Sequence, residues 1–219
     1  MNRLACLLEL LDWLRKADHH NVYIVDNGSS YPPLLDFYRT CDYRVITLAH
    51  PIHPRQVPRH PLVCSLIKDK YYVLTDPDIV PAEECPVDAV QHFYELLMEH
   101  KQLKRVGFGL KIDDLPEHFV HRRAVIRWER QFWETPLADH LYTAPIDTTF
   151  ALHRPEITVH TFDDCARTGP PYVARHLPWY IDSERLSPEE VYYRRHMNLK
   201  LNNWNQTYQP SWVERVPAL

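Results

Sequence analysis

Two carboxylates separated by one proline follow a strand-like run in the first half of the chain. Residues 71–74 are aromatic or branched, as in a covered β-strand, and Asp76, Pro77 and Asp78 end the run because proline cannot donate to a continuing ladder. In an open α/β sheet, ligands bind beyond the carboxyl ends of strands, where Mg²⁺ or Mn²⁺ takes one or two carboxylates and phosphate oxygens of the substrate. Asp76 and Asp78 are therefore candidate metal ligands. The alternative is an ordinary turn, in which Asp and Pro are common.

A second polar turn follows an earlier strand-like run at residues 22–25. It consists of Asp26, Asn27, Gly28 and Ser29. In a parallel sheet this turn shares an edge with the first one, so we expect the two to border one crevice. Asp26 can accept hydrogen bonds from a base or ribose, while Gly28 and Ser29 let the backbone approach a nucleotide. The alternatives are a common Asn-Gly turn, and an Asp26 that only caps the next helix.

Hydrophobic periodicity predicts the elements that must position these turns. Leucines spaced as on one helix face predict an amphipathic helix over residues 4–14, followed by a strand, a short helix at 33–39 and a strand at 43–48. This alternation predicts an α/β fold with a mainly parallel, Rossmann-like sheet flanked by helices. Further expected elements are helices at 87–97, 125–133 and 187–196 and strands at 106–112 and 148–152. We expect one domain over residues 1–197 and an irregular tail over 198–219.

Composition narrows the possible partners and the compartment. A net charge of -4 over 219 residues argues against a nucleic-acid binder that relies on a broad cationic face. The five cysteines form no C-x-x-C pair, so we expect reduced thiols and no structural zinc site. We also expect no transmembrane segment and no signal peptide, which makes the cytoplasm the default location, at most peripheral to membrane glycan assembly. The sequence leaves the oligomeric state open.

At this point the chain resembles the nucleotide-sugar-dependent glycosyltransferases of GT-A fold, in particular small bacterial and viral members. The matching segments are IVDNGSS at 24–30, TDPDIVP at 75–81, GFGLKIDDLP at 107–116, APIDTTFALHRP at 144–155 and ARHLPWYID at 174–182. The resemblance implies a hexosyltransferase-type enzyme that moves a sugar from a nucleoside-diphosphate sugar to a glycan or other hydroxyl acceptor. It also implies a single GT-A-like domain and a Mn²⁺ or Mg²⁺ cofactor.

The resemblance also implies roles for individual residues. The loop of Asp26 would hold the nucleoside, Asp76 and Asp78 would hold the metal on the donor diphosphate, and His176 would complete the metal shell. An inverting reaction needs a carboxylate that takes the acceptor proton, and the candidates are Asp147, ranked first, and then Asp114 and Asp113. A retaining enzyme needs no such base. Arg175 is a candidate clamp for the diphosphate, and Trp179 could stack on a sugar face.

One departure from the family pattern keeps two other classes open. Such enzymes usually open with a strand, whereas this chain starts almost in the first helix, so the recorded start is late, another segment fills the edge, or the protein is impaired. The first alternative class is a haloacid-dehalogenase-like phosphatase, in which Asp76 attacks phosphate and Lys111, Asp113 and Asp114 supply later motifs. The second is a non-catalytic, truncated remnant that binds sugar nucleotides.

Overall fold

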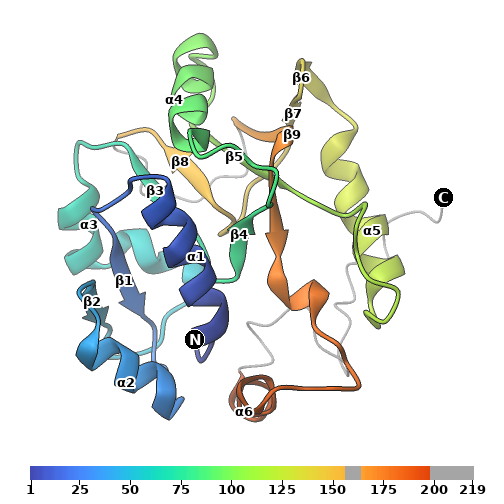
Figure 1. Ribbon diagram of the computed structural model, residues 1–219. Helices are drawn as coiled ribbons and strands as arrows, with labels where there is room; N and C mark the ends of the chain where they lie inside the picture. Colours follow the sequence, from blue (N-terminus) through green and yellow to red (C-terminus); the bar gives the residue numbers. More distant parts are fainter. Residues whose placement is uncertain (156–163, 198–219) are drawn as a thin grey trace.

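The computed structural model describes residues 1–155 and 164–197 and shows a mixed α/β protein (Figure 1). The helices are α1 (Leu4–Lys16), α2 (Pro32–Thr40), α3 (Pro61–Ile67), α4 (Ala89–Glu99), α5 (Arg122–Arg130) and α6 (Pro188–His196), with 3₁₀ turns η1 (Pro54–Arg59), η2 (Gln131–Trp133) and η3 (Leu177–Tyr180). The strands are β1 (Tyr23–Asp26), β2 (Arg44–Thr47), β3 (Tyr72–Leu74), β4 (Ile79–Pro81), β5 (Arg105–Leu110), β6 (Pro136–Ala138), β7 (Leu141–Thr143), β8 (Ala151–His153) and β9 (Cys165–His176). The predicted irregular tail at 198–219 lies outside the described residues.

The larger sheet has the order β3-β8-β5-β9-β7-β6, and β4 pairs with β9 beside this path. Within it, β5 and β9 run parallel, while β3–β8, β5–β8, β4–β9, β6–β7 and β7–β9 are antiparallel. The prediction of a mainly parallel sheet is therefore wrong for the larger sheet. The physical reason is that β8 runs opposite to both β3 and β5, and that β4 and β7 run opposite to β9.

A second, separate sheet consists of β1 and β2 alone. These two strands are parallel, with Tyr23 opposite Arg44 and Asp26 opposite Thr47. Four residues per strand and two strands make a sheet that is marginally stable by itself. It is held by a small hydrophobic cluster in which Leu7 and Leu11 of α1 pack with Ile24 of β1 and Leu34 of α2.

Helix α1 connects the two sheets because its apolar residues divide between two clusters. Leu10 belongs to the main core, and Trp13 of the same helix packs edge-on against Phe150 with ring centroids 5.9 Å apart. Leu7 and Leu11 belong to the cluster under β1. The helix therefore lies between the β1–β2 sheet and the larger sheet, as Figure 1 shows for α1 between β1 and β4.

The main core lies between the larger sheet and helix α4. Phe93 of α4, Phe108 of β5 and Phe150 form an aromatic cluster, with the Phe93 and Phe108 centroids 4.8 Å apart. Gly107 of β5 is needed for the close approach of β8, because a Cβ there would lie 2.6 Å from the Cβ of Ala151.

Local signals predicted most helices well. The predicted helices at 4–14, 33–39, 87–97, 125–133 and 187–196 correspond to α1, α2, α4, α5 with η2, and α6. The hydroxyl of Ser187 caps α6 by accepting a hydrogen bond from the Glu190 N–H at 3.1 Å. The sequence did not predict α3, the short strands β4, β6 and β7, or β9.

Candidate functional site

A cavity of about 1410 Å³ runs along α1 between the β1–β2 sheet and β3. At one end it is lined by residues at the end of β1, after β3, before β8 and at the end of β9, namely Asp26, Asn27, Asp76, Asp78, Asp147, Thr148, His176 and Trp179. Its other end is lined by residues that follow α1 or precede β3, including Asp18, His19, Lys70 and Tyr71. The two polar turns predicted to border one crevice therefore do so.

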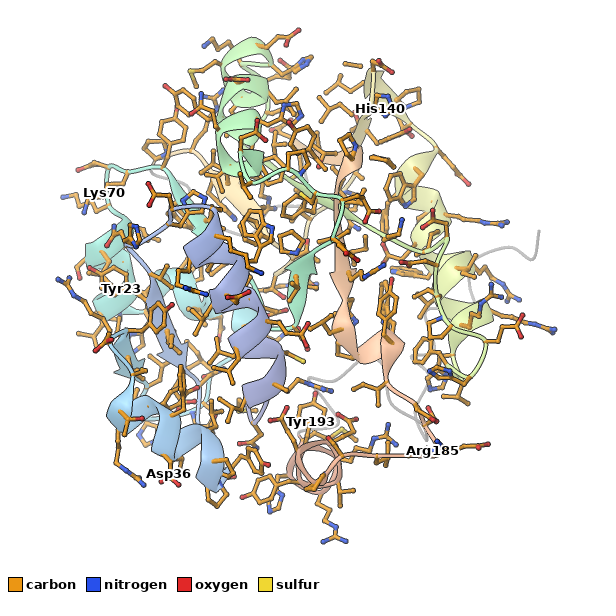
Figure 2. The ribbon with its side chains drawn as sticks, viewed as in Figure 1. Tyr23, Asp36, Lys70, His140, Arg185 and Tyr193 are labelled. Atoms are coloured by element: carbon orange, nitrogen blue, oxygen red, sulfur yellow. The ribbon has the colours of Figure 1, made fainter. Side chains whose placement is uncertain are left out.

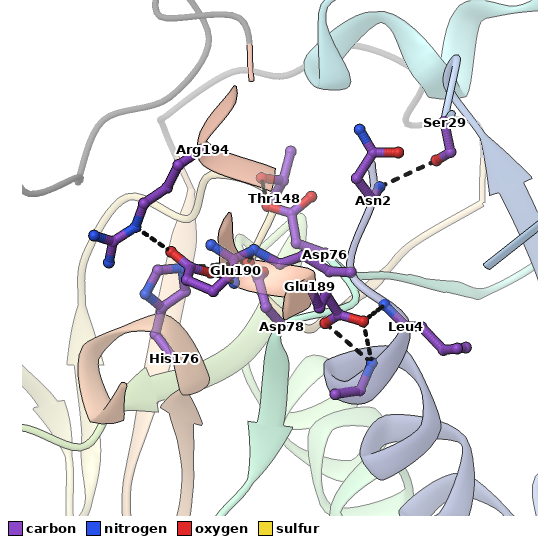
Figure 3. A network of polar contacts seen from close by, with 12 residues as sticks. Asn2, Leu4, Ser29, Asp76, Asp78, Thr148, His176, Glu189, Glu190 and Arg194 are labelled. Atoms are coloured by element: carbon purple, nitrogen blue, oxygen red, sulfur yellow. Dashed lines mark hydrogen bonds and ion pairs between the residues drawn. The ribbon is translucent and has the colours of Figure 1, made fainter. Parts of the chain in front are cut away.

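Asp76 is held on the cavity wall by the segment that precedes β8. Its backbone N–H donates to the Thr148 carbonyl at 2.8 Å, and the Thr148 hydroxyl donates to its carboxylate (Figure 3). Burial, and after it the nearby Asp78 carboxylate, raise the pKa of Asp76 to about 7, although the Thr148 hydrogen bond acts to lower it. Negative charge at this point is therefore costly without a cation.

Asp78 and His176 are placed side by side by the β4–β9 pairing. Ile79 lies opposite His176 in that ladder, and the Asp78 carbonyl accepts a hydrogen bond from the Leu177 N–H at 2.9 Å. As a result, His176 Nε2 lies 3.9 Å from Asp78 Oδ2. Burial lowers the pKa of His176 to about 4, so the imidazole is neutral at pH 7, and its Nδ1 is buried with no hydrogen-bond partner in the described part of the chain.

The donor set of Asp76, Asp78 and His176 fits a divalent cation that brings further ligands with it. Carboxylate oxygens suit Mg²⁺ and Mn²⁺, and neutral imidazole is a ligand for transition metals. However, in residues 1–155 and 164–197 no three His, Cys, Asp or Glu side chains converge closely enough to hold a metal ion alone. A cation at Asp78 and His176 would therefore need further ligands from a bound molecule, such as phosphate oxygens.

A basic residue that the sequence did not single out lies beside this acidic pair. Arg3 is 6% exposed, its Nε lies 3.6 Å from Asp78 Oδ2, and its Nη1 donates to Glu190 Oε2 at 2.9 Å. The guanidinium also lies 3.8 Å from the ring centroid of Tyr193, which is turned toward the start of α1 (Figure 2). Only the isolated arginine at the start of an apolar helix, three residues into the chain, could have drawn attention to it.

Two glutamates of α6 hold the start of α1 in place. Glu189 accepts hydrogen bonds from the backbone N–H of Leu4 at 2.9 Å and of Ala5 at 3.2 Å, which satisfies free donors of the first turn of α1 (Figure 3). Glu190 receives Arg194 Nε at 2.7 Å in addition to Arg3. Glu190 thus serves as a buried ion-pair partner between the start of α1 and α6.

The Asp26 turn is shaped by internal hydrogen bonds. The Asp26 carboxylate, on a residue 4% exposed, accepts from the Ser29 N–H at 3.2 Å, and the Asn27 amide exchanges two hydrogen bonds with the backbone of Ile52, at 2.6 and 2.8 Å. Gly28 has a φ of +95°, which favours glycine. Asn2 joins the turn to the chain start, because its N–H donates to Ser29 Oγ at 3.2 Å. Asp26 and Asn27 line the cavity, whereas Gly28 and Ser29 support the turn behind them.

Asp147 lies on the cavity wall and is paired with Arg55 of η1. Arg55 Nε donates to Asp147 Oδ1 at 2.7 Å and Nη2 donates to Oδ2 at 2.9 Å. Both side chains are about 40% exposed, so the pair faces the open cavity. Each Asp147 oxygen keeps a second lone pair, which could take a proton from an acceptor while the pairing with Arg55 persists.

The structure places Asp113, Asp114 and Arg175 outside the cavity lining. Asp114 accepts from Arg175 Nε at 3.0 Å and from the Tyr180 hydroxyl at 2.6 Å, and Asp113 Oδ1 lies 3.3 Å from Lys111 Nζ. Arg175 is therefore engaged with Asp114 and not directed at the acidic pair. The phosphatase alternative requires Lys111, Asp113 and Asp114 to lie beside Asp76. In the structure none of these three residues lines the cavity with Asp76.

Trp179 lines the cavity but is 2% exposed. Its ring packs edge-on against His176 with centroids 4.6 Å apart. In this arrangement Trp179 orients the histidine and does not present a face on which a sugar could stack.

Comparisons with known protein families, with curated proteins and with solved structures found no match. In the described residues, no helix combines the length and the apolar character required to cross a membrane.

Proposed function

We propose that this protein is a metal-dependent glycosyltransferase that transfers a sugar from a nucleoside-diphosphate sugar to a hydroxyl group of a glycan or similar acceptor, on a GT-A-like domain. The observation that carries the proposal is the shared cavity. Asp76 and Asp78 at the end of β3 line it together with Asp26 and Asn27 at the end of β1, and His176 lies beside Asp78. This is the arrangement needed to hold a diphosphate through a cation while the nucleoside lies against the neighbouring turn.

The residues of the cavity then have distinct tasks. Bound Mn²⁺ or Mg²⁺ supplies Lewis-acid stabilisation of the charge that develops on the leaving diphosphate. Asp78 and His176 bind the cation, and Asp76, locked by Thr148, adds negative charge behind them. Asp26 and Asn27 position the nucleoside. Asp147, held by Arg55, accepts the proton of the acceptor hydroxyl if the reaction inverts configuration.

Calorimetric titration with UDP-sugars and dTDP-sugars, in Mn²⁺ and in EDTA, tests the proposal. We expect at least about tenfold tighter donor binding with Mn²⁺, since two carboxylates repel a diphosphate unless a cation lies between them. Asp78→Asn should remove this difference. Asp114→Asn is the matched control, because Asp114 is paired with Arg175 outside the cavity. Equal donor affinity in Mn²⁺ and EDTA would contradict the proposal.

The contact between Arg3 and Asp78 favours a second candidate, a sugar-nucleotide-binding protein without turnover. A buried guanidinium 3.6 Å from the proposed metal ligand supplies positive charge where the cation would bind. Such a protein would bind donors equally well in EDTA and would release no sugar from them. Coupled detection of the released nucleoside diphosphate, with Mn²⁺ and a panel of hydroxyl acceptors, distinguishes the two candidates.

A further inference from the structure

The two sheets face each other across the cavity, and each presents an edge strand to it. β1 pairs with β2 and β3 pairs with β8, and within residues 1–155 and 164–197 neither strand has a second partner strand. Residues of both strands line the cavity along their length. The opposed edges therefore border a single space.

The backbone of Val73 points into this space. The Phe108 N–H donates to the Phe150 carbonyl at 3.1 Å, which directs the backbone groups of Phe150 and Leu152 toward β5. Because backbone groups alternate along a strand, Ala151 and His153 direct theirs toward β3, where they face Leu74 and Tyr72. The same alternation turns the N–H and C=O of Val73 away from β8 and toward the cavity.

The backbone of Val25 points into the space from the other side. The Leu48 N–H donates to the Asp26 carbonyl at 2.9 Å, so the backbone groups of Asp26, and by alternation those of Ile24, are directed toward β2. Val25 therefore directs its N–H and C=O to the edge away from β2. Val25 and Val73 both line the cavity.

The two edge strands run in the same direction. Their carboxyl ends meet at the start of α1, where Asn2 is bonded to Ser29 beyond β1 and Arg3 lies beside Asp78 beyond β3. Toward the end of α1 the cavity is lined by His19 and Lys70, which precede β1 and β3. A strand inserted here would be parallel to both of its neighbours.

The walls and the size of the cavity suit an extended apolar segment. α1 contributes Leu7, Leu11 and Leu14 and the η1–α3 segment contributes Val57 and Val63, so both walls are apolar. The volume of about 1410 Å³ exceeds the roughly 300–1000 Å³ of small-ligand sites, which leaves room beyond the acidic end.

We propose that the space between β1 and β3 is a docking site for an extended, apolar peptide segment of a partner protein, which adds a parallel strand and joins the two sheets into one. Main-chain hydrogen bonds to Val25 and Val73 would provide the affinity, as in other cases of strand addition. The segment is apolar on both faces, because α1 covers one side and η1 with α3 lines another. Asp18 and Lys70 both line the entry end and together set no charge preference there. At the other end Asp78 and Asp147 are paired with Arg3 and Arg55, whereas Asp26 and Asp76 have no basic ion-pair partner among the described residues and favour a basic residue after the strand. This inference does not depend on the proposed enzymatic function.

A capped peptide, Ac-Glu-Val-Ile-Val-Ile-Val-Lys-NH₂, tests the docking site on the full chain. We expect saturable binding by calorimetry, and amide exchange of Val25 and Val73 slowed by about tenfold or more at saturation. The peptide with the two charged residues exchanged should bind more weakly, because it places a glutamate beside the carboxylates of Asp26 and Asp76. The peptide with proline in place of the central valine should not bind, since it lacks the central N–H.

Variants of the edge strand complete the test. Val73→Pro removes the N–H that points into the cavity and no bond of the β3–β8 ladder, so the fold, followed by circular dichroism, is retained while the peptide is no longer bound. Val73→Ala, which keeps the N–H, is the matched control and should still bind. Equal binding of the proline-containing peptide, unchanged exchange at Val25 and Val73, or protection of both amides by self-association in the absence of peptide would each overturn the proposal.

Discussion

The guanidinium of Arg3 bridges two carboxylates from distant parts of the chain, with Nε 3.6 Å from Asp78 Oδ2 and Nη1 2.9 Å from Glu190 Oε2. Asp78 follows β3 and Glu190 belongs to α6, so one side chain connects the proposed metal ligand to the C-terminal helix of the described structure. Burial opposes the guanidinium charge, but Asp78, Tyr193 and Glu190 more than compensate, and the pKa of Arg3 is raised. Arg3 therefore stays charged at any pH at which the protein is folded.

Arg3 should compete with a divalent cation for Asp78. We expect Arg3→Met to tighten Mn²⁺ binding, because it removes the resident positive charge. The same change should lower the free energy of unfolding by up to about 3 kcal/mol, because among the described residues it leaves the buried Glu190 carboxylate with Arg194 as its ion-pair partner. Arg3→Lys, which keeps the charge, is the control. Titration calorimetry with Mn²⁺ and urea unfolding measure the two effects. Weaker Mn²⁺ binding in Arg3→Met would show that Arg3 supports the site and does not occupy it.

The sequence predicted the two polar turns and their shared cavity, but it could not predict their neighbours. Asp76 and Asp26 were recognisable because each follows a strand-like run, which is a local signal. Arg3 and Arg175 reach their carboxylate partners across 75 and 61 residues of chain, and such pairings leave no local pattern. Arg175 was therefore predicted as a phosphate clamp, whereas in the structure its charge is directed at Asp114.

Asp76 should make the stability of the metal-free protein fall with rising pH. Its carboxyl group, with an ordinary pKa of 3.8, holds its proton to about pH 7 in the folded protein. Below about pH 4 both states are protonated. Between these values the folded state binds more protons than the unfolded state, so the free energy of unfolding decreases by about 1.4 kcal/mol per pH unit as pH rises, and the loss is complete above pH 7.

Asp76→Asn removes this titration and can keep a hydrogen bond with Thr148. In EDTA, we expect the variant to be more stable than the wild type at pH 8 and to lack the decrease between pH 4 and 7. Asp113→Asn, at a side chain 76% exposed, is the control and should follow the wild type. Urea unfolding at a series of pH values gives both curves. Parallel wild-type and Asp76→Asn curves would show that Asp76 is ionised in the folded protein without a cation.

Gly107 should tolerate no side chain, because β8 packs directly over it. An added Cβ would lie 2.6 Å from the Ala151 Cβ and would also collide with the Phe150 carbonyl oxygen, so β5 and β8 would have to separate. We expect Gly107→Ala to lower the free energy of unfolding by about 1–3 kcal/mol, measured by urea unfolding. Gly169→Ala, whose nearest new contact is a Tyr142 ring carbon at 3.2 Å, should cost less. An unchanged midpoint in Gly107→Ala would contradict the tight β5–β8 packing.

The strand directions illustrate what local sequence patterns leave undetermined. The helix–strand alternation at the chain start predicted the parallel β1–β2 pair correctly. The same logic failed for β8, which is antiparallel to β3 and β5, because an apolar run of a few residues looks alike whichever way it pairs, and direction is decided by neighbours far along the chain. β9 was missed altogether, although it is twelve residues long and central to the sheet, since its polar residues and paired prolines break the expected alternation.

Asp147 should be the residue whose carboxylate matters most for turnover if the reaction inverts configuration. Asp147→Asn keeps the size of the side chain and removes the base, so turnover should fall by about 100-fold to 10,000-fold while donor affinity stays nearly unchanged. Because both Asp147 oxygens are bonded to Arg55, the same variant also releases that arginine. Arg55→Met separates the two effects, since it removes the arginine and leaves the Asp147 carboxylate in place.

Steady-state rates and donor affinities of Asp147→Asn, Arg55→Met, Asp113→Asn and Asp114→Asn, measured across pH, decide the assignment. A base at Asp147 predicts that Asp147→Asn loses far more turnover than Arg55→Met and also loses the acidic limb of its pH profile. Equal losses in these two variants would assign Asp147 to holding Arg55. If Asp147→Asn turns over normally and the Asp113 or Asp114 variant does not, the base belongs to the turn after β5, which would then have to reach the cavity by releasing Arg175. If all the carboxylate variants remain active, no side-chain base is required, and the reaction retains configuration.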